Sequence, residues 1–295
     1  MLNRKIDNEI DAHFSNSKKA LFLTGARQVG KTYSIRKYAK LHGLNLIEFN
    51  FLLQPEAMDI INGAGDVKEL LLRISAYSRV PLVRSKTLIF FDEVQECPDV
   101  MTWVKALVDE GSYIYALSGS LLGVELKDIR SVPVGYMSEM QVYPMDFEEF
   151  VSAVGVPENV LDAVKKSWSE KTLVDAYIHE KMMQLFQLYI IVGGMPAAVQ
   201  TYIDSNNIQN VVKEQRDIIN LYKKDIARYD KDVRKKLYIN EVFDLIPSEL
   251  NAKNKRFILK RLNENMTFGR HENDFIWLKD ADMALPTYNV EEPVS

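Results

Sequence analysis

Residues 23–34 read LTGARQVGKTYS, and no other stretch of the chain constrains its structure as strongly. Residues 25–32, GARQVGKT, match the pattern G-x-x-x-x-G-K-[ST] in full. The match follows the apolar run ALFLT and precedes a helical pattern, and this strand, loop and helix order is what a phosphate-binding loop requires. A glycine-containing turn with an incidental Lys-Thr pair is the alternative, and these flanks disfavour it. The stretch therefore predicts a loop that holds the phosphates of a nucleotide.

Each part of this loop has a physical task. Its glycines allow the backbone to curl so that N–H groups point at phosphate oxygens, and the N-terminus of the following helix adds a positive dipole end. Lys31 can reach the β- and γ-phosphates, and the Thr32 hydroxyl can bind Mg²⁺. The residues expected at the nucleotide are Gly25, Ala26, Arg27, Gln28, Val29, Gly30, Lys31, Thr32 and Tyr33.

A second element lies about sixty residues further on. Residues 88–93, LIFFDE, read as a buried strand that ends in two carboxylates. In this arrangement Asp92 holds the Mg²⁺ shell and Glu93 polarises an attacking water. A strand that simply ends in acidic loop residues is the alternative, and Glu96 is better explained as a capping or solvated residue. The loop predicts nucleotide binding, and the Asp92-Glu93 pair predicts hydrolysis in addition.

A third, weaker signal is the strand pattern YIYALSGS at residues 113–120, which ends in Ser118 and Ser120. Their hydroxyls can contact the γ-phosphate or the attacking water, although serines at a strand end are as often simple turn formers.

The pattern of apolar residues divides the chain into three parts. From residue 19 to residue 118, strand and helix patterns alternate, which predicts an α/β fold with a parallel sheet and helices on both faces. The expected parts are a phosphate-binding core at residues 1–145, an all-helical unit at 146–230, and a segment at 231–295 that is compatible with a helix-turn-helix or winged-helix module. In that last segment, Pro247-Ser248 and Gly269 are expected to separate short helices.

Composition describes an ordinary globular protein. Of 295 residues, 47% are apolar, and 37 basic against 41 acidic residues leave a formal net charge of −4. A single cysteine, Cys97, excludes an internal disulfide, and the charged start of the chain is unlike a signal peptide, so a cytoplasmic location without membrane contact is expected. The three tryptophans, Trp103, Trp168 and Trp277, occur in apolar helical settings and are expected in the core.

Four blocks together carry a family resemblance. ALFLTGARQVGKTYS, LIFFDEVQECPDVMTWVKALVD, YALSGSLL and QVYPMDFEEF, in that order, resemble the AAA+ superfamily ATPases of bacteria and archaea. The further blocks GGMPAAVQTYI, YKKDIARYD and NDFIWLKDADMALPTYNV are similar to an uncharacterised subgroup that has a C-terminal domain of unknown function. The resemblance implies ATP and Mg²⁺ as ligands, Thr32 and Asp92 at the metal, a water-activating Glu93 and a sensor hydroxyl at Ser118. For residues 1–145, 146–230 and 231–295 it implies an ATPase core, a helical lid and a winged-helix-like segment.

The chain departs from that resemblance in two places. Many relatives have Gly-Arg shortly before the YPxxFEEF block, where this chain has Gly135-Tyr136. The nearest arginine is Arg130, a candidate arginine finger acting across a homo-oligomer interface, with an ordinary solvated arginine as the alternative; without a placed finger, hydrolysis should be slow. Relatives also continue past the position of Ser295 into a further α/β domain, which implies a short form or a fragment.

Residues 231–261 form the one basic segment. The chain has nine basic residues there against four acidic ones, namely Lys231, Arg234, Lys235, Lys236, Lys253, Lys255, Arg256, Lys260 and Arg261 against Asp232, Glu241, Asp244 and Glu249. A basic segment of this kind can contact DNA through phosphates, although a solvated basic face is the commoner explanation.

Two functions from different classes follow. The first is a Mg²⁺-dependent ATPase whose nucleotide state moves the C-terminal module. The second is a nucleotide-binding switch with negligible turnover that recruits a partner or DNA. Glu93 favours the first, and Tyr136 in place of an arginine favours the second.

Overall fold

The apolar runs form a five-stranded parallel sheet in the computed structural model, which describes residues 2–120, 135–229, 233–252 and 268–287. The strand order is β2-β3-β4-β1-β5. The strands are β1 (Ala20–Thr24), β2 (Asn45–Asn50), β3 (Thr87–Asp92), β4 (Ile114–Ser118) and β5 (Met137–Gln141). The predicted α/β class with a parallel sheet is confirmed.

Burial along the strands explains the order of the sheet. Every residue of β1 and β3 is buried, and β4 is buried from its second residue on. Such continuous apolar runs are typical of strands that are covered on both faces and paired on both sides. The edge strands β2 and β5 alternate between more and less buried residues. The strand that precedes the phosphate loop is therefore next to the centre of the sheet, with β4 between it and β3.

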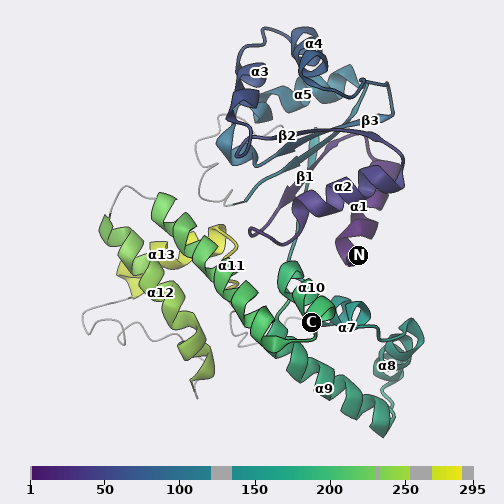
Figure 1. The fold of residues 1–295 in the computed structure, drawn as a ribbon, viewed down its shortest axis with the longest axis vertical. Coiled ribbons are helices and arrows are strands. Elements are labelled where there is room, and N and C mark those ends of the chain that lie inside the picture. Colours follow the sequence, from purple (N-terminus) through teal and green to yellow (C-terminus); the bar gives the residue numbers. More distant parts are fainter. Residues whose placement is uncertain (1, 121–134, 230–232, 253–267, 288–295) are drawn as a thin grey trace. The chain divides into compact units, whose positions relative to one another are not determined.

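Helices cover both faces of the sheet (Figure 1). One side has α1 (Lys5–Asn16) packed on α2 (Lys31–Leu41), and α2 also contacts β2, β3 and β4. The other side has α4 (Val67–Tyr77), which packs on both α3 (Met58–Asn62) and α5 (Val100–Glu110). Two 3₁₀ turns, η1 (Pro55–Ala57) and η2 (Val94–Glu96), follow the ends of β2 and β3.

The chain divides into two compact units. One comprises residues 1–119 and 129–218, and the other comprises residues 120–128 and 219–295. Besides the sheet, the first unit contains a helical part with its own apolar core. Its helices are α7 (Phe147–Ala153), α8 (Glu158–Glu170), α9 (Ala176–Val192), α10 (Pro196–Ser205) and the first half of α11 (Ile208–Tyr229). The domain boundaries at residues 145 and 230 stay predictions.

The helical part is joined to the chain after β5 by backbone contacts. Met145 N–H donates to the Gly194 carbonyl at 2.7 Å, and the Tyr189 hydroxyl donates to the Met145 carbonyl at 2.8 Å. A Cβ built on Gly194 would lie 2.2 Å from the Met145 oxygen. Glycine is therefore required at position 194 by the close approach of another backbone, which links the YPMDFEEF block to the GGMP block.

The second unit contains the end of α11 together with α12 (Val233–Asn251) and α13 (Phe268–Asp280). Its core is a cluster of buried apolar side chains from these three helices and the residue just after α13. They are Ile226, Ile239, Val242, Trp277, Leu278 and Ala281.

One of the two predicted helix breaks in this unit is wrong, because Pro247 lies inside α12. The break at Gly269 stays a prediction: α13 begins at Phe268, and residues 253–267 before it lie outside those described. A proline inside a helix costs about 3 kcal/mol, but α12 buries Ile239 and Val242 and packs Ile246 against the same cluster. Packing of this apolar face outweighs the local preference of one residue. The winged-helix-like arrangement stays a prediction.

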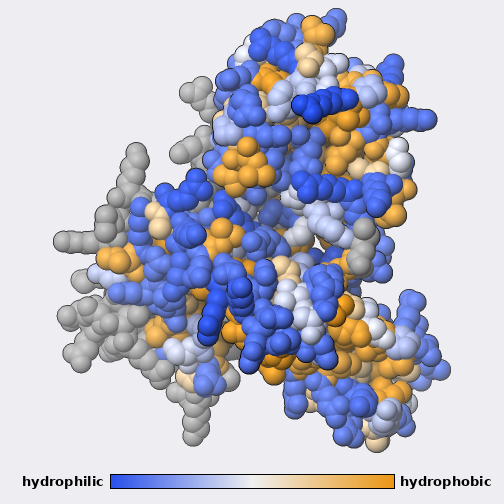
Figure 2. All heavy atoms as spheres, viewed as in Figure 1, coloured by the Kyte–Doolittle hydropathy of each residue, from blue (hydrophilic) through white to orange (hydrophobic). Residues whose placement is uncertain are grey.

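Exposed apolar side chains gather on the helical part of the first unit, where α9 and its neighbours carry apolar surface on the face in view (Figure 2). They include Trp168, Leu173, Tyr177, Met183, Phe186, Ile190 and Ile191. The core position expected for Trp168 is wrong, because its exposed fraction is 86%. The local core reaches Leu161, about two turns earlier in α8, and the last turns of that helix extend past it. Trp277 is buried as expected.

No single helix among the described residues is long and apolar enough to cross a bilayer, and α9 and α10 pass such a test only as a pair bent by 117°.

Replacing Gly194 tests the join between the two blocks. We expect Gly194→Ala to lower the free energy of unfolding by about 1–3 kcal/mol, because the added methyl group overlaps a backbone oxygen that cannot rotate away. Urea denaturation measures this change. Gly65→Ala is the matched control, because the nearest atom there is the end of the flexible Glu69 side chain, 3.2 Å away. Equal effects of the two substitutions would contradict the predicted role of Gly194.

Candidate functional site

The predicted phosphate loop runs from the end of β1 to the start of α2 and has an unusual backbone. Gly25, Gln28 and Gly30 all have positive φ, with values of 127°, 65° and 101°. A Cβ on Gly25 would lie 2.2 Å from the Val142 carbonyl oxygen. Glycine is thus required at position 25 both by its positive φ and by the carbonyl of Val142, just after β5, which packs against it.

Lys31 is folded back against the loop that precedes it. Its Nζ donates to the carbonyl oxygens of Gly25 and Ala26 at 2.7 and 2.8 Å, and the side chain is buried. Because the carbonyls of two loop residues hold it, the ammonium group lies inside the curve of the loop. This is the position from which it can meet phosphate oxygens.

Side chains from the ends of two strands and from the start of one helix meet at the Asp92 carboxyl group. Thr32 Oγ1, at the start of α2, donates to Asp92 Oδ2 at 2.9 Å. Asn50 Nδ2, at the end of β2, donates to the same oxygen at 2.9 Å, and Ser118 Oγ, at the end of β4, donates to Oδ1. The carboxyl ends of three parallel strands and the phosphate loop therefore meet at one carboxyl group.

Burial sets the electrostatics of this carboxyl group. Only 2% of Asp92 is exposed, and burial raises its pKa, while the hydrogen bonds from Ser118 and Thr32 lower it and the charge of Glu93 raises it further. The net direction is upward, so the charged form is disfavoured unless a cation lies nearby. A hydroxyl and a carboxylate in contact are the hard oxygen donors that Mg²⁺ prefers, and they fit a cation that keeps several waters.

Glu93 lies just beyond β3 in a constrained conformation. Its φ and ψ are 57° and 49°, a left-handed backbone that costs a non-glycine residue about 1–2 kcal/mol. The Gln95 side-chain amide donates to Glu93 Oε2, and Gln95 is itself buried. The orientation of the Glu93 carboxylate is therefore set by a neighbour two residues away.

The other predicted site residues are distributed as follows. Ala26, Val29, Ser118 and Ser120 are buried, Arg27 is partly buried, and Gln28 and Tyr33 are exposed. The structure brings Thr32, Asp92 and Ser118 into direct contact and places Lys31 against the loop. Arg130 and six of the nine basic residues of the segment from Lys231 to Arg261 lie outside the described residues.

Three residues at this site were not predicted from the sequence. Asn50 and Gln95 contact the two carboxylates, and Arg4 donates to a carbonyl of the phosphate loop. Asn50 ends a predicted strand, and this position gives a weak signal. Arg4 gives none, because its contacts reach residues up to 145 positions away in the sequence.

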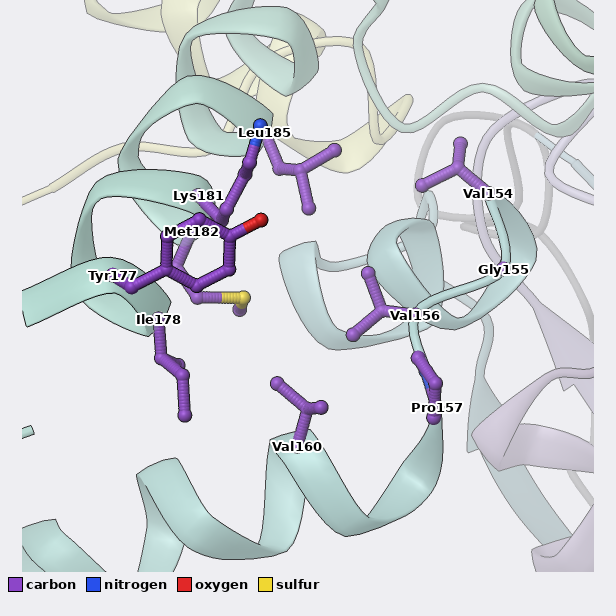
Figure 3. A pocket seen from close by; sticks show the side chains of 10 residues that line it. All are labelled: Val154, Gly155, Val156, Pro157, Val160, Tyr177, Ile178, Lys181, Met182 and Leu185. Carbon is purple, nitrogen blue, oxygen red and sulfur yellow. The ribbon is translucent and has the colours of Figure 1, made fainter. Parts of the chain in front are cut away.

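A separate apolar pocket lies in the helical part. A cavity of about 300 Å³ is lined by residues from the turn between α7 and α8, from the first turn of α8 and from one face of α9 (Figure 3). Lys181 is the one charged residue among those that line it, and no residue of the phosphate loop takes part. The pocket is thus distinct from the cluster around Asp92.

Two family models match the chain. Residues 17–151 match the model described as an AAA domain. Residues 183–294 match a model described as a domain of unknown function (DUF8612). The predicted combination of a P-loop AAA+ domain and a C-terminal part of unknown function is confirmed. No curated protein matches the chain in sequence.

One solved structure shares the fold, and two others are less similar to the chain. The Walker-type ATPase PABY2304 of Pyrococcus abyssi has 15% sequence identity and a TM-score of 0.53, over 95% of this chain and 90% of that one. AMPPCP-bound DnaA from Aquifex aeolicus has 12% identity and a TM-score of 0.40, over 95% and 93% of the two chains. The ORC1 protein of Aeropyrum pernix in complex with DNA has 16% identity and a TM-score of 0.37, over 95% and 83%. At these identities the likeness of the first structure concerns the fold alone.

The raised pKa of Asp92 predicts a pH-dependent stability. A carboxyl group whose pKa is higher in the folded than in the unfolded chain adds stability below its unfolded value of 3.8, and this contribution is lost as the pH rises through the folded value. We expect the free energy of unfolding of the wild type, relative to Asp92→Asn, to fall as the pH rises from about 3.8 toward neutrality. Urea denaturation in EDTA at a series of pH values measures it.

Ser118→Ala sharpens this test. It removes a hydrogen bond that lowers the pKa of Asp92, so the loss of stability should extend to higher pH than in the wild type. A difference between wild type and Asp92→Asn that does not change with pH would contradict the prediction.

Proposed function

The chain contains a P-loop AAA+ ATPase domain, and from this premise we propose that it binds ATP with Mg²⁺ and hydrolyses it slowly. The observation that carries the proposal is the contact of Thr32 and Ser118 with the buried Asp92 carboxyl group, with Glu93 the next residue along the chain. A loop that only binds phosphate does not need an acidic pair at the end of β3, two strands away in the same sheet.

The roles follow from the contacts. Loop N–H groups and Lys31 would bind the β- and γ-phosphates, exchanging the carbonyls of Gly25 and Ala26 for phosphate oxygens. Thr32 and Asp92 would hold Mg²⁺, which supplies positive charge against the phosphates when bound. Ser118 would keep Asp92 oriented, and its hydroxyl is the candidate sensor of the γ-phosphate.

Glu93 is the proposed base. It would accept a proton from a water whose oxygen attacks the γ-phosphorus, while the bond between that phosphorus and the bridging oxygen of ADP breaks. The Gln95 amide donates to one oxygen of this carboxylate and so helps to fix its orientation. The left-handed backbone at Glu93 presents the side chain from a fixed point at the strand end.

A nucleotide-binding switch with negligible turnover is the second candidate. It is favoured by the contact between Gln95 and Glu93, because a base that stays bound to its neighbour does not activate water. In this case ATP would order the site, and recruitment of a partner would be the output. Measured turnover separates the two candidates.

Glu93→Gln tests hydrolysis directly. If Glu93 is the base, the substitution should lower the ATP turnover number by about 10²- to 10⁴-fold and leave ATP binding intact, because proton transfer is lost but the cradle is not. Steady-state phosphate release and calorimetric ATP titration measure the two quantities. Glu96→Gln is the matched control, three residues along in the turn that follows β3, and should retain full turnover.

Lys31→Ala provides the second arm of this experiment. It should abolish Mg²⁺-dependent ATP binding, since the ammonium group is the positive side chain that the loop pattern offers to the β- and γ-phosphates. Tight binding with equal, near-zero turnover in the wild type and Glu93→Gln would favour the switch. ATP binding that survives in Lys31→Ala would overturn both candidates.

Coupling to other subunits and to DNA completes the proposal. If Arg130 acts as an arginine finger from a second copy of the chain, turnover per molecule should rise with protein concentration in the wild type and not in Arg130→Ala, with a loss of up to about 10³-fold. Turnover that does not depend on protein concentration would exclude an arginine finger supplied by a second copy of the chain.

If residues 231–261 contact DNA, duplex DNA should change the ATP turnover number, and this effect should weaken steeply as the salt concentration rises.

A further inference from the structure

Arg4 lies deep in the junction between the phosphate loop and the helical part of the first unit. Only 8% of it is exposed, although it lies four residues from the start of the chain. Its guanidinium donates from three different nitrogens to three different segments. Nη1 donates to the Val29 carbonyl at 2.9 Å, Nη2 to the Tyr143 carbonyl at 2.7 Å, and Nε to Glu149 Oε1 at 3.0 Å.

The contact with Val29 bears on the shape of the phosphate loop. A trans peptide is planar, so the carbonyl of Val29 and the N–H of Gly30 lie in one plane and point in opposite directions. No peptide bond of the described chain is cis. By holding the Val29 oxygen, Arg4 therefore directs the Gly30 N–H away from itself. Gly30 is the last residue before α2, where N–H groups of a phosphate loop meet the ligand.

Glu149 fixes Arg4 in turn. Its carboxylate is only 7% exposed and accepts from Arg4 Nε, from the backbone N–H of Lys5 at 2.7 Å and from the N–H of Asp146 at 3.0 Å. It also belongs to the capping box that starts α7. The first helix of the helical part is thus two hydrogen bonds from a carbonyl of the phosphate loop.

The glycine next to this carbonyl has the helical part as a second neighbour. A Cβ built on Gly30 would lie 3.5 Å from Arg4 Nη1 and 3.9 Å from Cγ of Pro196, the first residue of α10. Two helices of the helical part therefore approach the same peptide, one through Arg4 and one directly.

We propose that Arg4, held by Glu149, is a positioning residue that presets the Val29–Gly30 peptide for phosphate binding and transmits phosphate occupancy to the start of α7. The inference rests on the proposed binding of ATP. A buried ion pair adds little to stability once the cost of desolvating both charges is counted. The Arg4–Glu149 pair is therefore better explained as a device that positions the phosphate loop. A guanidinium group has several donors in one rigid plane, which an ammonium group lacks.

Arg4→Lys is the central variant, because it keeps the positive charge but has one nitrogen in place of three. We expect it to weaken ATP binding by at least about tenfold, measured calorimetrically with Mg²⁺ in a Glu93→Gln background that prevents turnover. In the same background with Arg4 present, saturating ATP should slow hydrogen exchange of the α7 amides. With Arg4→Lys, saturating ATP should leave these amides unchanged.

Lys5→Met is the matched control. Lys5 Nζ pairs with Asp146 and Glu148 at 2.7 Å, so it links the same start of the chain to the same helix start but touches no atom of the phosphate loop in these pairs. It should leave ATP affinity within about twofold and keep the response of α7. Equal losses in Arg4→Lys and Lys5→Met would mean that Arg4 only holds the junction together, and the proposal would be overturned.

A double variant without these two charges covers the case in which Arg4→Lys fails to fold. Arg4→Met combined with Glu149→Gln removes both buried charges together, so neither is left uncompensated. A folded double variant with full ATP affinity would overturn the proposal, and one with the expected loss would support it. If the Glu93→Gln protein with Arg4 intact binds no ATP, the proposed function fails first, which is distinct from ATP binding that is insensitive to Arg4.

Discussion

The carboxyl group of Asp92 lies at the end of a strand whose residues are all buried, where burial by itself disfavours its charged form. Donors from the ends of β2 and β4 and from the start of α2 offset part of this cost. Each of these elements must therefore end at the right place for the cluster to exist. The strand order, which puts β4 between β1 and β3, is what allows Ser118 and Thr32 to reach the same carboxyl group from two sides.

The phosphate loop depends on a second constraint, which is the close approach of other backbone. Gly25 leaves room for the carbonyl of Val142, and Gly194 leaves room for the carbonyl of Met145. Val142 and Met145 belong to the short segment that leaves β5 and leads into α7. This segment also supplies the Tyr143 carbonyl to Arg4. The loop and the helical part are thus held by the same few residues, which connects the phosphate loop physically to the helices.

The Asp92 cluster and the Arg4–Glu149 ion pair would respond differently to ligand binding. At Asp92, Mg²⁺ would be the cation that compensates the carboxylate, so this part of the site would change most when ligand binds. At Arg4 and Glu149 the charges are already paired, so this part would act by holding geometry. The exposed apolar side chains of α9 lie in the same helical part.

The sequence by itself determined the elements that are local. Continuous apolar runs predicted the central strands, and the loop pattern between a strand and a helix predicted where Lys31 and Thr32 would lie. The acidic pair was predicted at the end of β3. In each case a few adjacent residues and their flanks carry the signal, because helix start, strand end and glycine turn are properties of short segments. Local rules failed at Pro247, where packing on Trp277 and its neighbours outweighs the preference of proline.

Only the tertiary structure decided which distant residues meet. Asn50 reaches Asp92 across 42 positions, and Arg4 reaches Glu149 across 145. Gly194 is required because of a carbonyl that no pattern near it announces. The exposure of Trp168 likewise depends on where the local core ends and not on the helix that carries it. Such contacts depend on how whole elements pack, so no local pattern around Arg4 predicts its contact with the phosphate loop.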